Sequence, residues 1–221
     1  MFARRPANQW GAMNKVILGI FAALAVFVVI LVLAGVGTYN GLVNRSQAVD
    51  AQWAQVQNVY QRRADLIPNL VATVSGAANF EKSTLTEITN ARASVGKVQL
   101  GGNGAPSAAQ LAQFEQAQGA LSSALSRLLV VTENYPNLKA TANFQELQAQ
   151  LEGTENRISV ERGRFNDLSR DYNSAIRRVP AVFFAAMLGF KEKAYFAATP
   201  GSDKPPQVQF DFSGKTVPPK P

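Results

Sequence analysis

One uninterrupted apolar segment constrains this chain more than any other feature. Residues 16–36 form a run of 21 residues made up only of Val, Ile, Leu, Phe, Ala and Gly. As a helix the run extends about 31 Å, which matches the roughly 30 Å hydrocarbon core of a bilayer. A cleaved signal peptide is the alternative, but its apolar region would be shorter, about 7–15 residues. Leu33-Ala34-Gly35 is also a poor cleavage site. The run therefore predicts an uncleaved transmembrane anchor.

The anchor divides the chain into four parts. Residues 1–15 are a basic flank, 16–36 are the anchor, 39–198 form one helical domain, and 199–221 are a tail rich in Pro and Lys. The domain is long enough to bury a core of its own. We expect the tail to be disordered, because its composition offers little to bury.

Basic residues on the two sides of the anchor predict its orientation. Arg4, Arg5 and Lys15 precede the anchor without any acidic residue, whereas Arg45 is the first basic residue after it. The positive-inside rule therefore predicts a cytoplasmic N-terminus and an extracytoplasmic domain, in a single-pass protein of the bacterial inner membrane. If translation began at Met13, only Lys15 would remain before the anchor, and the rule would no longer predict an orientation.

Composition excludes most catalytic chemistry. The chain has no Cys and no His, which rules out thiolate chemistry, Cys/His zinc sites and imidazole catalysis. No carboxylates have the spacing of a catalytic pair, so we expect no catalytic residues, metal site, cofactor or small-molecule substrate. The net charge of +7 raises the question of nucleic acid. No helix carries a basic stripe interleaved with aromatic residues, however, so we do not expect that partner.

Beyond the anchor, apolar residues recur at steps of three and four, which is typical of packed helices. The periodicity predicts helices over about 49–74, 82–98, 111–135 and 144–179, with Ser107 as a cap and Pro136 and Pro180 as stops. The fold class is thus all-α, an N-terminal transmembrane helix followed by an up-down antiparallel four-helix bundle with long helices. Pro68 should kink or break the first helix.

Four polar residues occupy positions in these seams where apolar residues are expected: Gln118, Thr132, Thr154 and Glu161. One interpretation is that they line a ligand or ion site. The other is that they lie near the ends of the bundle or set the register of the helices. We favour the second interpretation.

The segment 182–190 is apolar but too short to span a membrane. The topology brings it next to the bilayer, where Phe183, Phe184 and Phe190 are candidates for contact with the membrane surface. The cations that flank it are Arg177, Arg178, Lys191 and Lys193. Apolar residues bracketed by cations suit an interface with anionic lipid. The alternative, which we favour slightly, is a lid over the base of the bundle.

Short motifs follow one another along the whole chain. They are Tyr39-Asn40-Gly41-Leu42-Val43, Arg62-Arg63-Ala64-Asp65-Leu66-Ile67-Pro68-Asn69-Leu70-Val71, Ala91-Arg92, Tyr135-Pro136-Asn137-Leu138-Lys139-Ala140, Asn143-Phe144, Leu151-Glu152-Gly153-Thr154-Glu155-Asn156-Arg157-Ile158, Phe165-Asn166, Tyr172-Asn173, Pro180 and Gly189-Phe190. Together they resemble the bacterial LemA family. The resemblance implies a membrane protein with a four-helix bundle behind one N-terminal anchor, and it implies no enzymatic activity.

The charged residues of the densest motif have two possible roles. The candidate residues are Arg62, Arg63, Asp65, Glu155 and Arg157. The cluster at 62–65 could form an internal latch with acids on the fourth helix, such as Glu155. They could instead form a docking site for a partner. We favour the latch, because the charges of this part of the chain are balanced.

The sequence thus predicts a non-enzymatic, membrane-anchored scaffold or adaptor of the bacterial cell envelope. Its partners would be the lipid bilayer and another envelope protein, further copies of itself, or both. One alternative is a lipid-binding or membrane-shaping protein that acts through segment 182–190. A carboxylate-dependent enzyme is the least favoured alternative.

Overall fold

A computed structural model describes residues 8–77, 80–98 and 104–197 of the chain. All regular elements within these residues are helices. They are α1 (Asn8–Ser75), α2 (Lys82–Lys97), α3 (Ala108–Thr132), α4 (Pro136–Lys139), α5 (Ala142–Arg177) and α6 (Ala181–Ala185). The expected all-α class is therefore confirmed. The tail at 199–221 lies outside the described residues.

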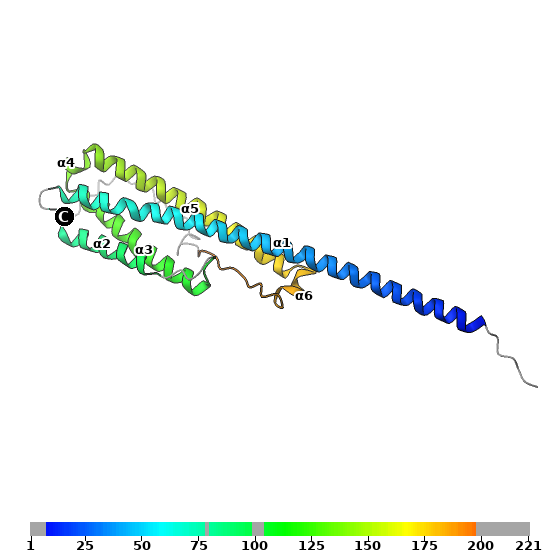
Figure 1. The fold of residues 1–221 in the computed structure, drawn as a ribbon. Coiled ribbons are helices and arrows are strands. Elements are labelled where there is room, and N and C mark those ends of the chain that lie inside the picture. Colours follow the sequence, from blue (N-terminus) through cyan, green and yellow to red (C-terminus); the bar gives the residue numbers. More distant parts are fainter. Residues whose placement is uncertain (1–7, 78–79, 99–103, 198–221) are drawn as a thin grey trace, which may run out of the picture.

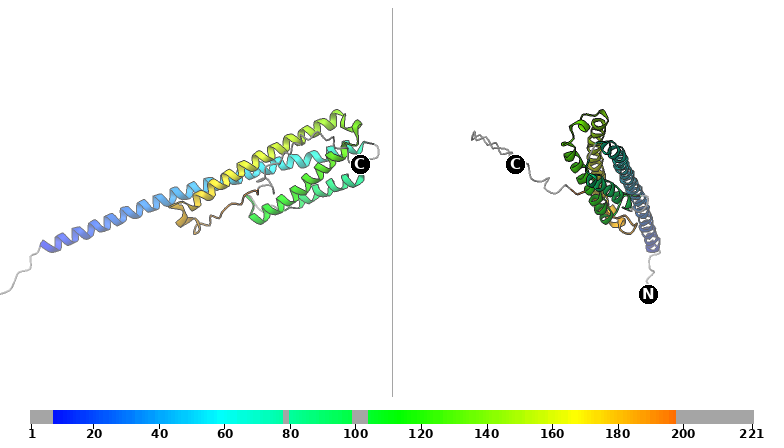
Figure 2. Two further views of the ribbon diagram at one scale, coloured as in Figure 1. Left: turned by 180° about the vertical axis from the view of Figure 1, so that it is seen from behind. Right: turned by 90° about the vertical axis from the view of Figure 1, so that its left-hand side faces the viewer.

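Helix α1 contains both the apolar run and the first helix of the domain. It is 68 residues long, so it extends about 100 Å. Its apolar half projects from the helical domain as a free rod (Figures 1 and 2), and the side chains of that half are exposed. Among the described residues, α1 is the one helix long and apolar enough to cross a membrane. The anchor and the domain thus share one continuous helix.

The remaining helices run back and forth along the domain half of α1 (Figures 1 and 2). The closest helix neighbours are α1 with α5 and α2 with α3. Large side chains link the two pairs, because Phe114 of α3 packs edge-on against Trp53 and Tyr60 of α1, at ring-centroid distances of 5.4 and 4.8 Å. The regular up-down four-helix bundle expected from the sequence stays a prediction.

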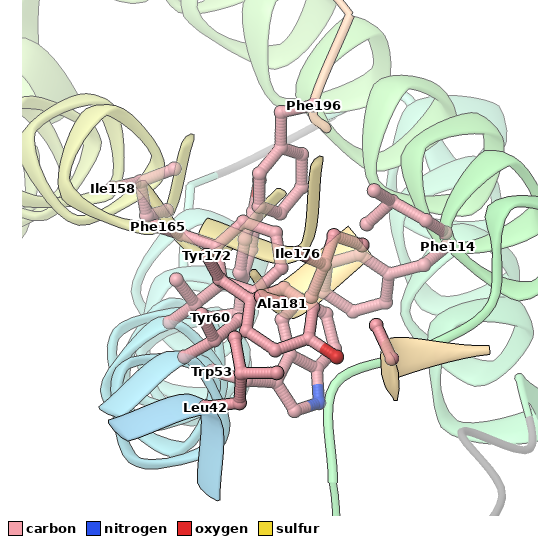
Figure 3. Close-up of a cluster of buried hydrophobic side chains, with 14 residues drawn as sticks. Leu42, Trp53, Tyr60, Phe114, Ile158, Phe165, Tyr172, Ile176, Ala181 and Phe196 are labelled. Atoms are coloured by element: carbon pink, nitrogen blue, oxygen red, sulfur yellow. The ribbon is translucent and has the colours of Figure 1, made fainter. Parts of the chain in front are cut away.

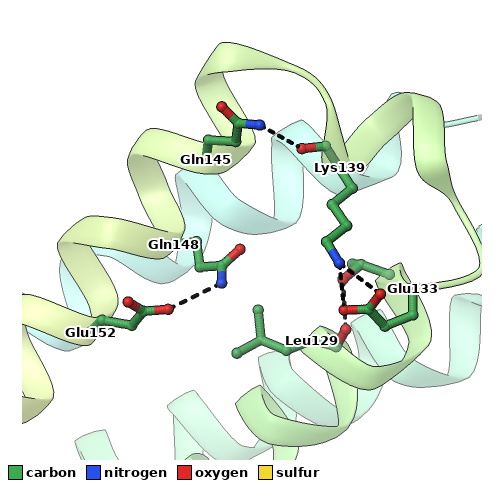
Figure 4. Close-up of polar contacts among 7 residues, drawn as sticks. Leu129, Glu133, Lys139, Gln145, Gln148 and Glu152 are labelled. Atoms are coloured by element: carbon green, nitrogen blue, oxygen red, sulfur yellow. Dashed lines mark hydrogen bonds and ion pairs between the residues drawn. The ribbon is translucent and has the colours of Figure 1, made fainter.

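Local signals explain where the helices begin. Ser107 caps α3 in a capping box with Gln110, as expected, and Pro136 starts the short helix α4. The Thr141 side chain accepts a bond from the N–H of Phe144 and caps α5, which begins two residues earlier than the apolar pattern suggested. Across the turn from α3 to α5, Lys139 pairs with Glu133 at 2.6 Å and Gln145 donates to the carbonyl of Lys139 (Figure 4).

The core consists of two apolar clusters arranged along the domain. The cluster nearer the anchor is aromatic, with Trp53, Tyr60, Phe114, Phe165 and Tyr172 at its centre (Figure 3). The far cluster is mostly aliphatic; its α1 members include Leu66, Ile67, Leu70 and Val74. Most of the seam positions expected from the sequence are buried in one of these clusters, because the three- and four-residue steps keep them on one helix face.

Of the kink or short break expected at Pro68, the break is wrong. Helix α1 continues through Pro68 to Ser75 without interruption. Pro68 has no N–H to donate to the carbonyl of Ala64, four residues earlier. That carbonyl instead accepts a hydrogen bond of 3.0 Å from Arg92 Nε of α2. A side chain from the neighbouring helix thus replaces the missing backbone donor, and the exposed proline ring faces away from the core.

We predict that Arg92→Ala lowers the free energy of unfolding by about 1 kcal/mol, because the Ala64 carbonyl loses its donor. In a Pro68→Ala background the new N–H at position 68 can bond that carbonyl, so the same Arg92 substitution should have little effect. Chemical denaturation of the full chain in detergent, followed by circular dichroism, measures both values. Equal losses in the two backgrounds would contradict this role of Arg92.

Candidate functional site

A buried arginine lies between the two apolar clusters. Arg63 of α1 is 1% exposed and follows Tyr60 of the aromatic cluster by one helical turn. Its Nη1 pairs with Glu155 of α5 and donates to Ser122 Oγ of α3 at 2.9 Å, while Nη2 donates to Gln118 Oε1. One guanidinium group therefore ties together α1, α3 and α5.

The ion pair of Arg63 and Glu155 is asymmetric. The Arg63 side chain is almost fully buried, whereas the Glu155 side chain is 46% exposed. A buried charge is stable only when paired and hydrogen-bonded, so Arg63 depends on Glu155 more than Glu155 depends on Arg63. Arg63 also stacks over the Tyr60 ring, with Cζ 5.1 Å from the centroid. Its Nε is buried with no partner among the described residues.

The other charged residues of this motif lie elsewhere. Arg62 and Arg157 are both exposed and line one groove between α1 and α5, together with Asn58 and Gly153. Neither cation forms an ion pair with any other described residue. Asp65 is exposed and accepts a hydrogen bond of 2.7 Å from Gln61 of its own helix. The structure thus brings Arg63 and Glu155 together and separates both from Arg62, Asp65 and Arg157.

A cleft of about 340 Å³ opens beside the Arg63 layer, with Tyr60, Glu115, Gln118 and Arg162 among its lining residues. Its charges neutralise one another, because Arg162 pairs with Glu115 at 2.9 Å and Arg63 pairs with Glu155. Burial raises the pKa of Tyr60 above its usual value near 10, and this outweighs the opposing effect of the two arginines. Tyr60 therefore stays a neutral phenol at neutral pH.

The polar residues of the seams mostly bond their own surroundings. Thr132 and Thr154 donate to carbonyls of their own helices, Leu129 and Gln150. Gln118 accepts from Arg63, and Glu161 accepts from Gln52 of α1 at 2.6 Å. These four side chains do not converge on a common site. This supports the interpretation that they have structural roles and do not line a ligand or ion site.

An extended strap, residues 190–197, follows α6 and packs back along α5 (Figure 1). Two asparagines of α5, two helical turns apart, hold its backbone. The side chain of Asn173 bonds both the N–H and the carbonyl of Lys193, each at 2.9 Å, and Asn166 does the same for Phe196 at 2.8 and 3.1 Å. Phe196 enters the aromatic core beside Trp53.

The residues expected at the membrane surface divide into two groups. Phe190 packs against the aromatic cluster and Lys193 turns inward to pair with Asp50 at 2.9 Å. Arg177 pairs with Glu192 at 2.6 Å. Phe183 is exposed, Phe184 is half-buried, and Arg178 and Lys191 are exposed. Segment 182–190 is thus partly a cover of the domain and partly exposed.

Sequence reasoning assigned no role to Asp50, Ser122, Asn166, Asn173 or Phe196. A signal existed for the two asparagines: each follows an aromatic residue, in Phe165-Asn166 and Tyr172-Asn173, and they are seven residues apart. That spacing puts them on one face of α5. Asp50 had no such signal, because its contacts with Ala105 and Lys193 join segments remote in sequence.

Comparison with known proteins identifies the family. Residues 52–210 match the LemA family. The chain belongs to the LemA family. Magnetosome proteins MamQ 2 and MamQ 1 of Paramagnetospirillum magneticum are each 28% identical to it, over 83% of this chain and 75% of theirs. Magnetosome protein MamQ of Magnetospirillum gryphiswaldense is 27% identical, over 77% of this chain and 70% of its own.

The family match covers α1 from residue 52 to its end, all of α2 to α6 and the strap. Together with the apolar half of α1, it identifies this LemA-family chain as a membrane-anchored helical protein. The names of the family and of the MamQ relatives are not those of enzymes. The motifs of the resemblance include Arg63, Glu155, Asn166 and Asn173, which are the residues that connect the elements of the domain.

We predict that Glu155→Ala lowers the free energy of unfolding by about 2 kcal/mol, because it leaves the buried Arg63 charge unpaired. In an Arg63→Met background the same substitution should have an effect below about 0.5 kcal/mol. Glu152→Ala, at an exposed position of α5, is the matched control. Chemical denaturation with a Trp10→Phe chain, followed by Trp53 fluorescence, measures the changes. A Glu155 effect that is the same in both backgrounds would contradict the latch.

Proposed function

We propose that this LemA-family protein is a non-enzymatic scaffold or adaptor of the bacterial cell envelope, which holds a docking surface at a fixed position above the membrane. The observation that carries this proposal is the continuity of α1, which passes from the apolar run into the domain core without a break. A continuous helix fixes the position and the orientation of the domain relative to the membrane. A flexible linker would fix neither, and a tethered enzyme does not need them fixed. In this proposal the two close helix pairs act as one up-down four-helix bundle.

The docking surface is the groove of Arg62 and Arg157. Both cations point to solvent without a carboxylate partner among the described residues, and Asn58, Gln150 and Gly153 leave the groove open between them. Two adjacent, unneutralised guanidinium groups suit an acidic segment of a partner protein, because guanidinium binds carboxylates in a bidentate geometry. Arg63, by contrast, is satisfied inside the domain and serves as the latch.

We further propose that the protein resides in the inner membrane, with the domain on the extracytoplasmic side. Three basic residues before the anchor support this orientation. The magnetosome proteins among the relatives support a role at a membrane. Nucleic acid and small-molecule substrates have no part in this proposal.

The docking surface is tested by photocrosslinking in cells that produce the full-length chain. A photoreactive residue at Asn58 lies in the groove and leaves both arginines intact, and one at Ser159, exposed on α5, is the control. We expect crosslinks to another envelope protein from position 58 and not from 159. The double charge reversal Arg62→Glu/Arg157→Glu should abolish them, whereas Arg62→Lys/Arg157→Lys should retain part of them.

Two outcomes would contradict the assignment of this groove to another envelope protein. Crosslinks only between copies of the chain would replace the adaptor by a self-assembling scaffold. Crosslinks of equal strength from positions 58 and 159 would show that the groove is not the docking surface.

The orientation is tested separately, since a chain without Cys accepts single cysteine labels. We expect Ser126→Cys in α3 to react with a membrane-impermeant maleimide in intact spheroplasts. Asn14→Cys, before the anchor, should react only after permeabilisation. The reverse pattern would place the domain in the cytoplasm.

A further inference from the structure

Helix α6 has an inner and an outer face of different character. Ala181 and Ala185 are each 5% exposed and belong to the aromatic cluster. Phe183 is 71% exposed, and Met187, just beyond the helix, is 76% exposed. Large apolar side chains that gather on one surface require a cover.

The position of α6 beside α1 indicates what covers its exposed apolar side chains. Phe184, Met187 and Leu188 form one wall of an apolar groove of about 480 Å³. The opposite wall is part of the apolar run of α1, with Val28, Leu31 and Gly35 among its residues. α6 lies where α1 leaves the domain (Figure 1). The groove is therefore continuous with the surface of the anchor itself.

The length of the anchor fixes the depth of this groove. The run of 21 apolar residues is about as long as the hydrocarbon core is thick, so it cannot shift along the membrane normal without moving polar residues into lipid. Its domain end, Val36, therefore lies near the hydrocarbon boundary. Val28 lies eight residues further in, or about 12 Å deeper. A groove that reaches Val28 opens into acyl chains and not into water.

Contacts with the domain hold α6 at this depth. The Phe190 and Tyr39 rings meet edge-on at 5.7 Å, and the strap that follows is clamped to α5 by Asn173. Since both ends of the segment are attached, its apolar side chains cannot withdraw from the anchor without breaking these contacts.

Two exposed cations flank the segment. Arg178 and Lys191 are exposed and form no ion pair with the described residues, unlike their neighbours Arg177 and Lys193. Unpaired cations at the edge of an inserted apolar segment attract lipid phosphates.

We propose that residues 182–188 insert into the leaflet next to the domain, that a phospholipid acyl chain fills the groove between α6 and α1, and that its phosphate binds near Arg178 and Lys191. The insertion adds protein volume to one leaflet only. It is independent of the docking surface at Arg62 and Arg157, and it holds for either orientation of the chain.

Depth is tested by spin labelling of the full chain in vesicles of phosphatidylethanolamine and phosphatidylglycerol. A nitroxide at Met187→Cys is compared with labels at Val32→Cys in the anchor and Val130→Cys on α3, three positions that are all more than half exposed. We expect the label at 187 to match the one at 32, with high access to oxygen and low access to a water-soluble nickel chelate. A match with the label at 130 would overturn the insertion.

Occupancy of the groove is tested with a phospholipid that carries a photoreactive acyl chain. A Cβ atom added at Gly35 would meet no other atom within 4 Å, and neither would one at Gly19, which is in the same helix but not in the groove. Gly35→Phe should reduce crosslinking of residues 184–188 several-fold, and Gly19→Phe should leave it unchanged. Equal crosslinking in both variants would show that no acyl chain occupies the groove.

The phosphate contact is tested by Arg178→Glu/Lys191→Glu. In anionic vesicles we expect the label at 187 to become more accessible to the nickel chelate. A label that does not respond would remove these cations from the proposal. None of these readouts depends on a protein partner, so the scaffold proposal can fail while the insertion holds, and the reverse.

Discussion

The structure depends on helix α1, whose first half is suited to lipid and whose second half packs in the core of the helical domain. The large apolar side chains of residues 16–36, in the first half of α1, are exposed and are stable only where lipid surrounds them, because they have no core to enter. The second half buries one face against α5 and the large side chains of α3. Since no break separates the halves, the apolar run and the domain share one helix axis. The close pairing of α5 with α1, and the return of α6 to the edge of the apolar run, both follow from this shared axis.

Arg63 joins three helices of the domain in one layer of contacts. Apolar clusters on either side of it tolerate small shifts, because dispersion and burial are not directional. A buried guanidinium group is less tolerant, since it needs Gln118, Ser122 and Glu155 at fixed positions on two other helices. Replacing such a layer by apolar residues often does not reduce stability. Of the residues in this layer, Arg63 and Glu155 lie in the motifs that resemble the LemA family.

The strap at residues 190–197 is held to α5 by side chains that bond its backbone. Asn166 and Asn173 present a donor and an acceptor each to an extended segment, as a neighbouring β-strand would. This arrangement lets an irregular strap pack on a helix without leaving its peptide groups unsatisfied. The strap in turn fixes α6 against α1. The motif Gly189-Phe190 contributes here as well, because Gly189 has a φ of +81°, which favours glycine, and the turn brings Phe190 back to Tyr39.

The sequence alone determined the anchor, the order of the helices and most of the buried seams, because these depend on local composition and on steps of three and four along one helix. It also indicated the pairing of Arg63 with Glu155. Tertiary structure decided which of two adjacent arginines is buried, since that depends on the rotation of α1 against α3 and α5. It decided that α1 continues past Pro68, because the compensating donor is Arg92 of another helix. It also turned Lys193 toward Asp50, 143 residues away, and left Arg178 and Lys191 exposed. Such contacts join residues remote in sequence, and no periodicity within one helix encodes them.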